Sequence, residues 1–224
     1  MPMKPINIAI DGPAGAGKST VAKGVAKKLG YIYVDTGALY RAIGVHALRN
    51  GVDTKDAEGV GALLDEIKVE LKFVDGVQKV FLCGEDVSEA IRTPDASMAA
   101  SNVSAIPSVR AFLLDLQRDI ASKNNCLMDG RDIGTVVLPD AQVKIFMTAD
   151  VEERAMRRYK ELQEKGISDT FEQVLSEMRE RDFQDSNRPI APLKPAEDSV
   201  VFDSTGHTLQ QSIDEISALI GEKI

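Results

Sequence analysis

Cysteine, histidine and long apolar runs are all scarce in this sequence of 224 residues. Cys83 and Cys126 lie far apart without CxxC spacing, so we expect reduced thiols rather than a disulfide framework or a zinc site. His46 and His207 have no metal-ligand spacing either. No run of 18 apolar residues occurs and the N-terminus shows no signal-peptide pattern, which predicts a cytoplasmic protein that does not span a membrane.

Basic residues are also in deficit, with 27 lysines and arginines against 35 acidic residues and a formal net charge of −8. This excess of negative charge argues against general binding to nucleic acid or to an anionic membrane, so any bound polyanion must be held by a local site. The sequence has no fixed-period repeat and no low-complexity tract. Its length and its 43% hydrophobic content predict a single domain over residues 1–224.

Strand-like and helix-like segments alternate along most of the chain. The expected core strands are residues 6–11, 31–35, a segment from Cys126, 143–149 and 199–204. The expected helices are residues 18–29, 36–51, 107–122, 151–165, 171–185 and 208–220. This alternation predicts an α/β fold in which a five-stranded parallel sheet is covered by helices.

A different pattern interrupts this alternation between residues 67 and 93. Val69, Leu71 and Phe73 alternate with charged residues, Asp75-Gly76 is a strong turn signal, and a partner strand is expected at residues 78–83. Antiparallel structure inside an otherwise alternating chain predicts an inserted lobe. A hairpin at the edge of the main sheet is the alternative.

The segment GPAGAGKS, residues 12–19, matches the Walker A pattern GxxxxGK[ST] and lies between an expected strand and an expected helix. Its glycines allow backbone N–H groups to turn towards a phosphate, and the helix N-terminus adds its positive dipole. Lys18 is placed to bridge the β- and γ-phosphates, and the Ser19 hydroxyl to ligate Mg²⁺. ATP or GTP is expected to bind at Gly12, Pro13, Ala14, Gly15, Ala16, Gly17, Lys18, Ser19 and Thr20.

The class of phosphate-loop protein is narrowed by motifs that the sequence does not have. The guanine-reading patterns NKxD and TKxD are absent, which disfavours a GTPase. ATPase motors usually have an apolar strand that ends in Asp-Glu, and this sequence has none, which disfavours a motor. A small-molecule kinase is therefore favoured.

Charged residues at the ends of two further strands predict a second substrate site. In DTGALYR, Asp35 and Thr36 could cap the next helix, whereas Tyr40 and Arg41 would lie near the mouth of the phosphate loop. DGRD, residues 129–132, also ends a strand, and its alternative interpretation is a buried Asp-Arg pair.

Arginines at helical spacing predict a lid. Arg154, Arg157 and Arg158 recur at intervals of three and four, so they could form a salt-bridged face with Glu153 and Glu161. The other interpretation is a mobile lid that brings guanidinium groups to a transferring phosphoryl group. The same two interpretations apply further along the chain to Arg181, Asp185 and Arg188.

Six segments, in order and spacing, resemble the bacterial-type cytidylate kinases, within the nucleoside monophosphate kinases: GPAGAGKST, DTGALYR, GEDVSEAIRTPD, DGRDIGTVVLPDA, VKIFMTA and RERDFQDSNR. The resemblance covers nearly the whole chain. It implies a three-layer phosphate-loop kinase fold with an antiparallel lobe over the monophosphate site at about 63–103 and a short helical lid at about 150–188. It also implies a monomer that transfers the γ-phosphoryl of ATP to CMP or dCMP with Mg²⁺, in pyrimidine nucleotide metabolism.

The resemblance further implies roles for individual residues. The cytosine side of the pocket would be formed by Thr36, Ser101, Arg110 and Asp132. The acceptor phosphate and ribose would be held by Arg41, Arg131, Arg188, Arg181 and Asp185, with Tyr40 nearby. Phosphoryl transfer would involve Lys18, Arg131, Arg154, Arg157 and Arg158, and the assignment among the three lid arginines stays open.

The chemistry of cytosine fits this set, because an exocyclic amine beside two acceptors complements a carboxylate, a guanidinium and hydroxyls. Uracil would place a carbonyl against Asp132, and a site that leaves buried polar groups unpaired rejects such a ligand. Two alternatives remain. One is a phosphate-loop kinase for another monophosphate or an alcohol, with Asp35 or Asp132 as general base. The other is a nucleotide-binding regulator without turnover, which the paired arginine sites disfavour.

Overall fold

Short apolar segments bounded by turns form the strands of this protein, and amphipathic segments form its helices. The computed structural model describes residues 4–74, 77–164 and 166–224. The strands are β1 (Asn7–Asp11), β2 (Ile32–Asp35), β3 (Val69–Val74), β4 (Val77–Leu82), β5 (Glu85–Asp86), β6 (Cys126–Gly130), β7 (Val143–Thr148) and β8 (Val200–Asp203). The α-helices are α1 (Lys18–Leu29), α2 (Thr36–Arg49), α3 (Ala57–Leu63), α4 (Pro94–Val103), α5 (Pro107–Lys123), α6 (Val151–Glu164), α7 (Phe171–Asn187) and α8 (Leu209–Gly221).

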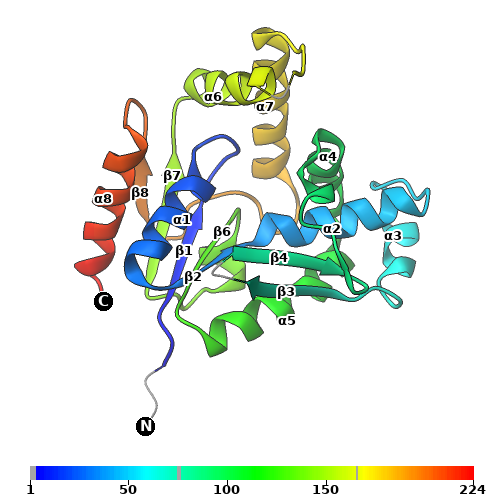
Figure 1. Cartoon of the computed structure of the whole chain (residues 1–224), viewed down its shortest axis with the longest axis horizontal. Coiled ribbons are helices and arrows are strands. Elements are labelled where there is room, and N and C mark those ends of the chain that lie inside the picture. Colours follow the sequence, from blue (N-terminus) through cyan, green and yellow to red (C-terminus); the bar gives the residue numbers. More distant parts are fainter. Residues whose placement is uncertain (1–3, 75–76, 165) are drawn as a thin grey trace. The chain divides into compact units, whose positions relative to one another are not determined.

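The predicted five-stranded parallel sheet is confirmed, with the order β2-β6-β1-β7-β8 (Figure 1). β1 is the central strand, and its last residue, Asp11, pairs with Gly130 of β6 on one side and Phe146 of β7 on the other. The chain leaves β1 for one half of the sheet and later crosses to the other half. Open α/β sheets bind their ligands at the carboxyl ends of strands around such a switch point.

The chain divides into two compact units, each of which is described by itself. Residues 1–33 and 124–224 form the sheet unit, with most of the parallel sheet and the helices α1, α6, α7 and α8. Residues 34–123 form the hairpin unit, with α2 to α5 and the three antiparallel strands. The segment 63–103, for which the sequence predicts an inserted lobe, lies inside the hairpin unit.

The core of the sheet unit lies between the sheet and two helices. Ile8 and Ile10 of β1 pack with Val25 of α1 and Ile216 of α8 in one buried cluster. The helices α1 and α8 approach closely at Gly24, which has no side chain. A Cβ atom added there would lie only 2.4 Å from the Cδ1 atom of Ile213. The packing fixes α1, and therefore the phosphate loop at its N-terminus, against the sheet.

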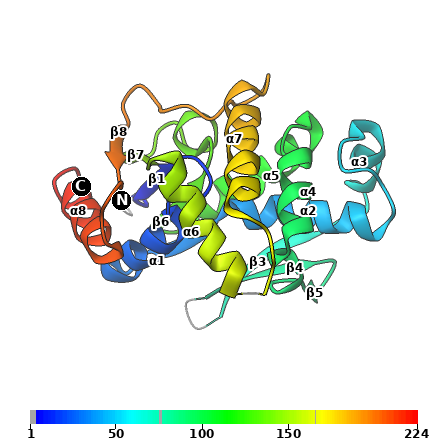
Figure 2. The ribbon, with the colours of Figure 1, turned by 90° about the horizontal axis from the view of Figure 1, so that it is seen from above.

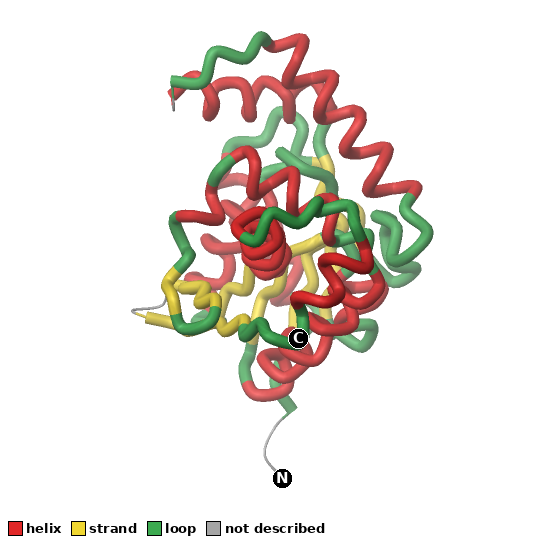
Figure 3. The backbone as a smooth tube through the Cα atoms, turned by 90° about the vertical axis from the view of Figure 1, so that its right-hand side faces the viewer, coloured by secondary structure: helices red, strands yellow, loops and turns green. Residues whose placement is uncertain are grey.

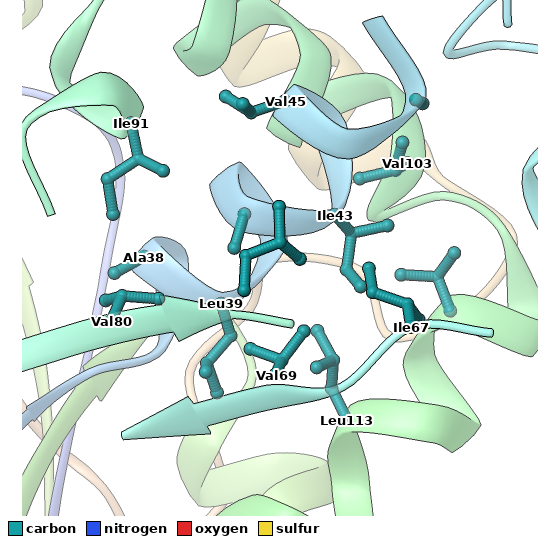
Figure 4. Close-up of a cluster of buried hydrophobic side chains, with 14 of the residues drawn as sticks. Ala38, Leu39, Ile43, Val45, Ile67, Val69, Val80, Ile91, Val103 and Leu113 are labelled. Carbon is teal, nitrogen blue, oxygen red and sulfur yellow. The ribbon is translucent and has the colours of Figure 1, made fainter. Parts of the chain in front are cut away.

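A second core holds the hairpin unit together (Figure 4). Leu39 and Ile43 of α2 pack against Val69 of β3, Val80 of β4 and Leu113 of α5. The strands β3, β4 and β5 form their own antiparallel sheet, so the alternative of a hairpin at the edge of the main sheet is wrong. The expected turn at Asp75-Gly76 lies outside the described residues.

The two helices of the expected lid region pack against each other (Figures 2 and 3). Ala155 and Leu162 of α6 and Val174 and Met178 of α7 form their buried contact. Lys165, where the first of these helices was expected to end, is not among the described residues. In the part of the chain that the structure describes, no helix is both long and apolar enough to cross a bilayer.

Candidate active site

The phosphate loop follows β1 and passes close to β7. Gly12, Gly15 and Gly17 all have positive φ angles, of 147°, 73° and 84°. At Gly12 an added Cβ atom would lie 1.9 Å from the backbone oxygen of Met147, so glycine is required by space as well as by conformation. The loop then leads directly into α1, whose first residue is Lys18.

Lys18 is buried, and its ammonium donates a hydrogen bond of 2.7 Å to the carbonyl of Pro13 in the same loop. Burial, together with the nearby guanidinium of Arg131, lowers the pKa of Lys18 to about 7, although Asp129 and Asp11 oppose this change. A phosphate bound in the loop would add negative charge and so favour the charged form of Lys18.

Two of the three predicted lid arginines contact the phosphate loop. Arg154 is buried and donates to the carbonyls of Ala149 (2.9 Å) and Ala14 (3.0 Å), and also to Asp182 of α7 (2.7 Å). Arg157 donates to the carbonyl of Ala16 in the loop at 3.5 Å. Helix α6 is thus anchored by its arginines to the loop that binds phosphate.

The remaining lid contacts match the salt-bridge interpretation. Arg157 pairs with Glu153, and Arg158 pairs with Glu161 at 3.2 Å on a more exposed part of α6. The expected pairing with Glu153 and Glu161 is therefore confirmed. It does not decide which arginine acts on a phosphoryl group.

The charged segment at the end of β6 pairs with the C-terminal end of α7. Arg131 donates to Asp185 at 2.9 Å, and Arg188 donates to Asp132 at 3.3 Å. Asp132, Asp185 and Arg188 are all buried. Burial alone would raise the pKa of Asp185, but the guanidinium of Arg131, with Arg181 and Arg188, holds it below its usual value. The structure thus brings together four of the predicted substrate residues in two ion pairs.

Asp11, at the end of β1, is a site residue that sequence reasoning missed. Its carboxylate oxygens accept hydrogen bonds of 2.7 Å from the backbone N–H groups of Ile133 and Gly134. These two residues begin η2 (Ile133–Val137), a π-helical turn directly after Asp132. The signal was present, because Asp11 ends an apolar strand just as residues 129–132 do.

Of the other predicted substrate residues, Arg181 lies on α7 in the sheet unit, and the rest belong to the hairpin unit. Asp35 caps α2 by accepting from the N–H of Ala38, as the sequence suggests, and it also pairs with Arg41 at 2.7 Å. Arg110 donates to the carbonyl of Ser104 at 3.2 Å and lies over the ring of Tyr40, 5.7 Å from its centroid. Thr36 is buried, and Ser101 is partly buried on α4. Their roles at a substrate stay predictions.

Ser19 is the residue that the sequence predicts as a ligand of a metal ion that arrives with a nucleotide. It lies in the first turn of α1, beside Lys18, and is exposed. Among residues 4–74, 77–164 and 166–224 there is no cluster of three or more histidine, cysteine or acidic residues able to hold a metal. Mg²⁺ commonly binds through one or two protein oxygens and the phosphates themselves, and a single hydroxyl fits that mode.

Comparison with known proteins places this arrangement in a family. The family model for cytidylate kinase matches residues 8–222. A cytidylate kinase of Caldicellulosiruptor saccharolyticus is 52% identical over 97% of this chain and 96% of its own length. A cytidylate kinase of Ligilactobacillus salivarius is 52% identical over 99% of both chains.

The likeness to solved structures is weaker and concerns the fold alone. An uncharacterized protein from Eubacterium ventriosum aligns with a TM-score of 0.54 at 16% identity, over 98% of this chain and 99% of that one. The family match, in contrast, extends over the phosphate loop, the segment at the end of β6 and both helices of the expected lid region. The chain belongs to the cytidylate kinase family.

Proposed function

We propose that this protein transfers the γ-phosphoryl group of ATP to CMP and dCMP, producing ADP with CDP or dCDP. The observation that carries the proposal is that two groups of charged residues lie close together in the sheet unit. One is the glycine-rich loop with Lys18. The other consists of two ion pairs, Arg131 with Asp185 and Arg188 with Asp132. The first suits the triphosphate of a donor, and the second suits a nucleotide that carries an acceptor phosphate.

The transfer needs charge stabilisation more than it needs a base. An oxygen of the CMP phosphate attacks the γ-phosphorus, a new P–O bond forms, and the bond from that phosphorus to the β-phosphate oxygen breaks. The attacking oxygen is already largely ionised near neutral pH, so no side chain has to remove a proton. Lys18, with guanidinium groups from Arg131 and the lid, would neutralise the charge on the transferring group.

The two ion pairs supply the acceptor contacts. Arg131 and Arg188 would exchange their carboxylate partners for the oxygens of the acceptor phosphate. Asp132, released from Arg188, could accept from the exocyclic amine of cytosine. Asp185 could accept from a ribose hydroxyl, and Arg181 could donate to a ribose hydroxyl oxygen. In this scheme, the nucleotide replaces one partner in each of the two ion pairs.

The family resemblance implies further residues that bind the acceptor. By the family resemblance, Thr36, Ser101 and Arg110 would bind the cytosine side, while Arg41 with Tyr40 would lie by the phosphate. Arg41 is paired with Asp35, just as Arg131 is with Asp185. The segments of about 63–103 and 150–188 are proposed to act as the lobe and the lid of this kinase.

Mg²⁺ would be bound by the Ser19 hydroxyl together with the phosphates of ATP, and it would offset the negative charge between them. We further propose a monomer that works in the cytoplasm in pyrimidine nucleotide metabolism, with no nucleic-acid or membrane partner. The free thiol of Cys83, which is exposed, suits a reducing compartment.

One assay tests the proposed activity. Purified protein is incubated with Mg-ATP and one of CMP, dCMP, UMP, AMP or GMP, and ADP production is followed. We expect CMP and dCMP to give the highest kcat/KM values. ADP production with CMP no faster than with buffer would exclude the proposal. Activity confined to an alcohol or another monophosphate would favour a different phosphate-loop kinase.

A further inference from the structure

A single carboxylate connects the central strand to the segment that carries Arg131 and Asp132. Asp11 uses both of its oxygens, one for the N–H of Ile133 and one for the N–H of Gly134, each at 2.7 Å. These are the first two residues after Asp132. The contact joins parts of the chain that are more than 120 positions apart, since the sequence separations are 122 and 123.

The surroundings leave this contact little freedom. Asp11 is 5% exposed, and both Ile133 and Gly134 are buried. A Cβ atom added at Gly134 would lie 3.4 Å from an Asp11 carboxylate oxygen and 3.2 Å from the Cδ atom of Lys144. The space around residue 134 is therefore closely filled, most tightly by the side chain of Lys144.

The carboxylate is held in this position against its own preference. Burial raises the pKa of Asp11 to about 6, although the N–H groups of Gly134 and Ile133 and the charge of Lys18 lower it. Because this pKa is above the ordinary value of 3.8, the free energy of unfolding falls as the pH rises between these two values, and the full cost of the buried carboxylate is present above about pH 6. Because the buried carboxylate lowers the free energy of unfolding at neutral pH, we look for its role in the backbone turn that it holds.

We propose that Asp11 is a positioning residue, which fixes the turn after Asp132 and thereby aims Arg131 and Asp132 at the acceptor nucleotide. This inference rests on the proposed function, because it assigns a purpose to the orientation of those two side chains. Asp11 also directly precedes Gly12, the first residue of the phosphate loop. The end of the central strand therefore positions both the phosphate loop and the segment with Arg131 and Asp132. Asp11 itself has no contact with substrate in this scheme.

The test is Asp11→Asn, which keeps the shape and one acceptor oxygen but turns the other oxygen into a donor that faces an N–H group. We expect KM for CMP to rise roughly tenfold or more, because a hydrogen bond to a charged group is lost. The ratio of kcat/KM for CMP to that for UMP should fall, because Asp132 is less well aimed. The dissociation constant for ATP should change less than about twofold.

The matched control is Asp56→Asn. Asp56 also accepts a backbone hydrogen bond, from the N–H of Glu58 at 3.1 Å, but it caps α3 in the hairpin unit. Asparagine caps a helix as well as aspartate does, so this variant should match the unchanged protein in all three constants. Thermal unfolding at pH 7.5 completes the comparison, and Asp11→Asn should unfold no more than about 2 °C below the unchanged protein.

A second measurement needs no activity at all. Amide hydrogen exchange of Ile133 and Gly134, followed by NMR, should be at least roughly tenfold faster in Asp11→Asn, while that of Met128 in β6 stays unchanged. If the unchanged protein does not phosphorylate CMP, the proposed function fails, and exchange still decides whether Asp11 holds the turn.

Three outcomes would overturn the inference. Unchanged exchange at both amides would mean that the carboxylate does not order the turn. An equal loss of ATP and CMP binding would mean that Asp11 acts through the phosphate loop. A large fall in the unfolding temperature, with KM for CMP and the dissociation constant for ATP raised in parallel, would mean that its role is structural only.

Discussion

The buried charge of Lys18 lowers the free energy of unfolding of this protein. The residue is 6% exposed, and its ammonium donates a hydrogen bond to the carbonyl of Pro13. Its pKa in the folded protein, about 7, lies below the ordinary value of 10.5, so the unfolded chain binds more protons between these two values. The free energy of unfolding therefore increases as the pH rises from about 7 to 10.5. Below about pH 7 Lys18 is charged in both states, so the full cost of burying its charge is present.

Lys18→Met should separate stability from activity. We expect the thermal unfolding temperature without nucleotide to rise by about 2–4 °C at pH 6.5, because a buried ammonium is replaced by an apolar chain of similar length. Phosphoryl transfer should be abolished. Calorimetry between pH 6.5 and 9.5 measures the first effect, which should shrink as the pH rises, and ADP production measures the second.

Lys27→Met is the matched control, because Lys27 is exposed on the same helix. It should change the free energy of unfolding by less than about 0.5 kcal/mol and leave turnover intact. A Lys18→Met protein that still transfers phosphoryl groups would contradict the assignment of the loop.

At the same scale, the sequence identifies the charged ends of strands but not their partners. The motif DGRD predicts that Arg131 and Asp132 lie at a strand end, and the structure confirms this position. Arg131 pairs with a residue 54 positions away and Asp132 with one 56 positions away. Such pairs depend on how α7 packs on the sheet unit, and no local spacing encodes that.

Helices α6 and α7 depend on Arg154 for much of their attachment. This arginine reaches the loop at Ala14, the end of β7 at Ala149 and α7 at Asp182, each through a different nitrogen. Only a planar group with several donors in fixed directions can make such contacts at once, and a lysine ammonium cannot.

Arg154→Lys should therefore be severe for a conservative change. We expect the free energy of unfolding from urea titration to fall by about 2 kcal/mol, because buried hydrogen bonds to charged and backbone groups are lost. The control, Arg158→Lys, alters an exposed pair with Glu161 and should change it by less than about 0.5 kcal/mol. Equal values for the two variants would show that Arg154 does not anchor the lid helices.

The success of sequence reasoning also differs between elements. The core strands and the long helices have clear periodicity, and all were expected to within a few residues. Helices α3 and α4 were not expected. α3 has seven residues, two of them glycines, and the buried face of α4 consists of Ala96, Ala99, Ala100 and Val103. Small side chains give a weak helical pattern, although the Thr93 cap and Pro94 were signals of a helix start.

For the whole molecule, ligand binding should appear as added stability. A ligand present at about 100 times its dissociation constant stabilises the folded state by about 2.7 kcal/mol, which for a chain of this size is a shift of about 5–10 °C. The cytosine assignment predicts such a shift with CMP and a much smaller one with UMP at the same concentration.

Asp132→Ala should remove most of the shift caused by CMP and leave the shift caused by a non-hydrolysable ATP analogue. Asp140→Ala, an exposed aspartate eight positions further along the chain, is the control and should preserve both shifts. Thermal unfolding with each ligand measures them. Loss of both shifts in Asp132→Ala would indicate that this residue supports the fold instead of reading the base.

The closeness of Gly12 to Met147 also limits how this gene can vary. With an added Cβ only 1.9 Å from a backbone oxygen, no codon other than glycine can be accepted at position 12 without moving β7. Gly30 and Gly51 also have positive φ angles, but nothing lies within 4 Å of an added Cβ at either position. A saturation library selected for growth would keep glycine alone at residue 12 and would admit asparagine at residues 30 and 51.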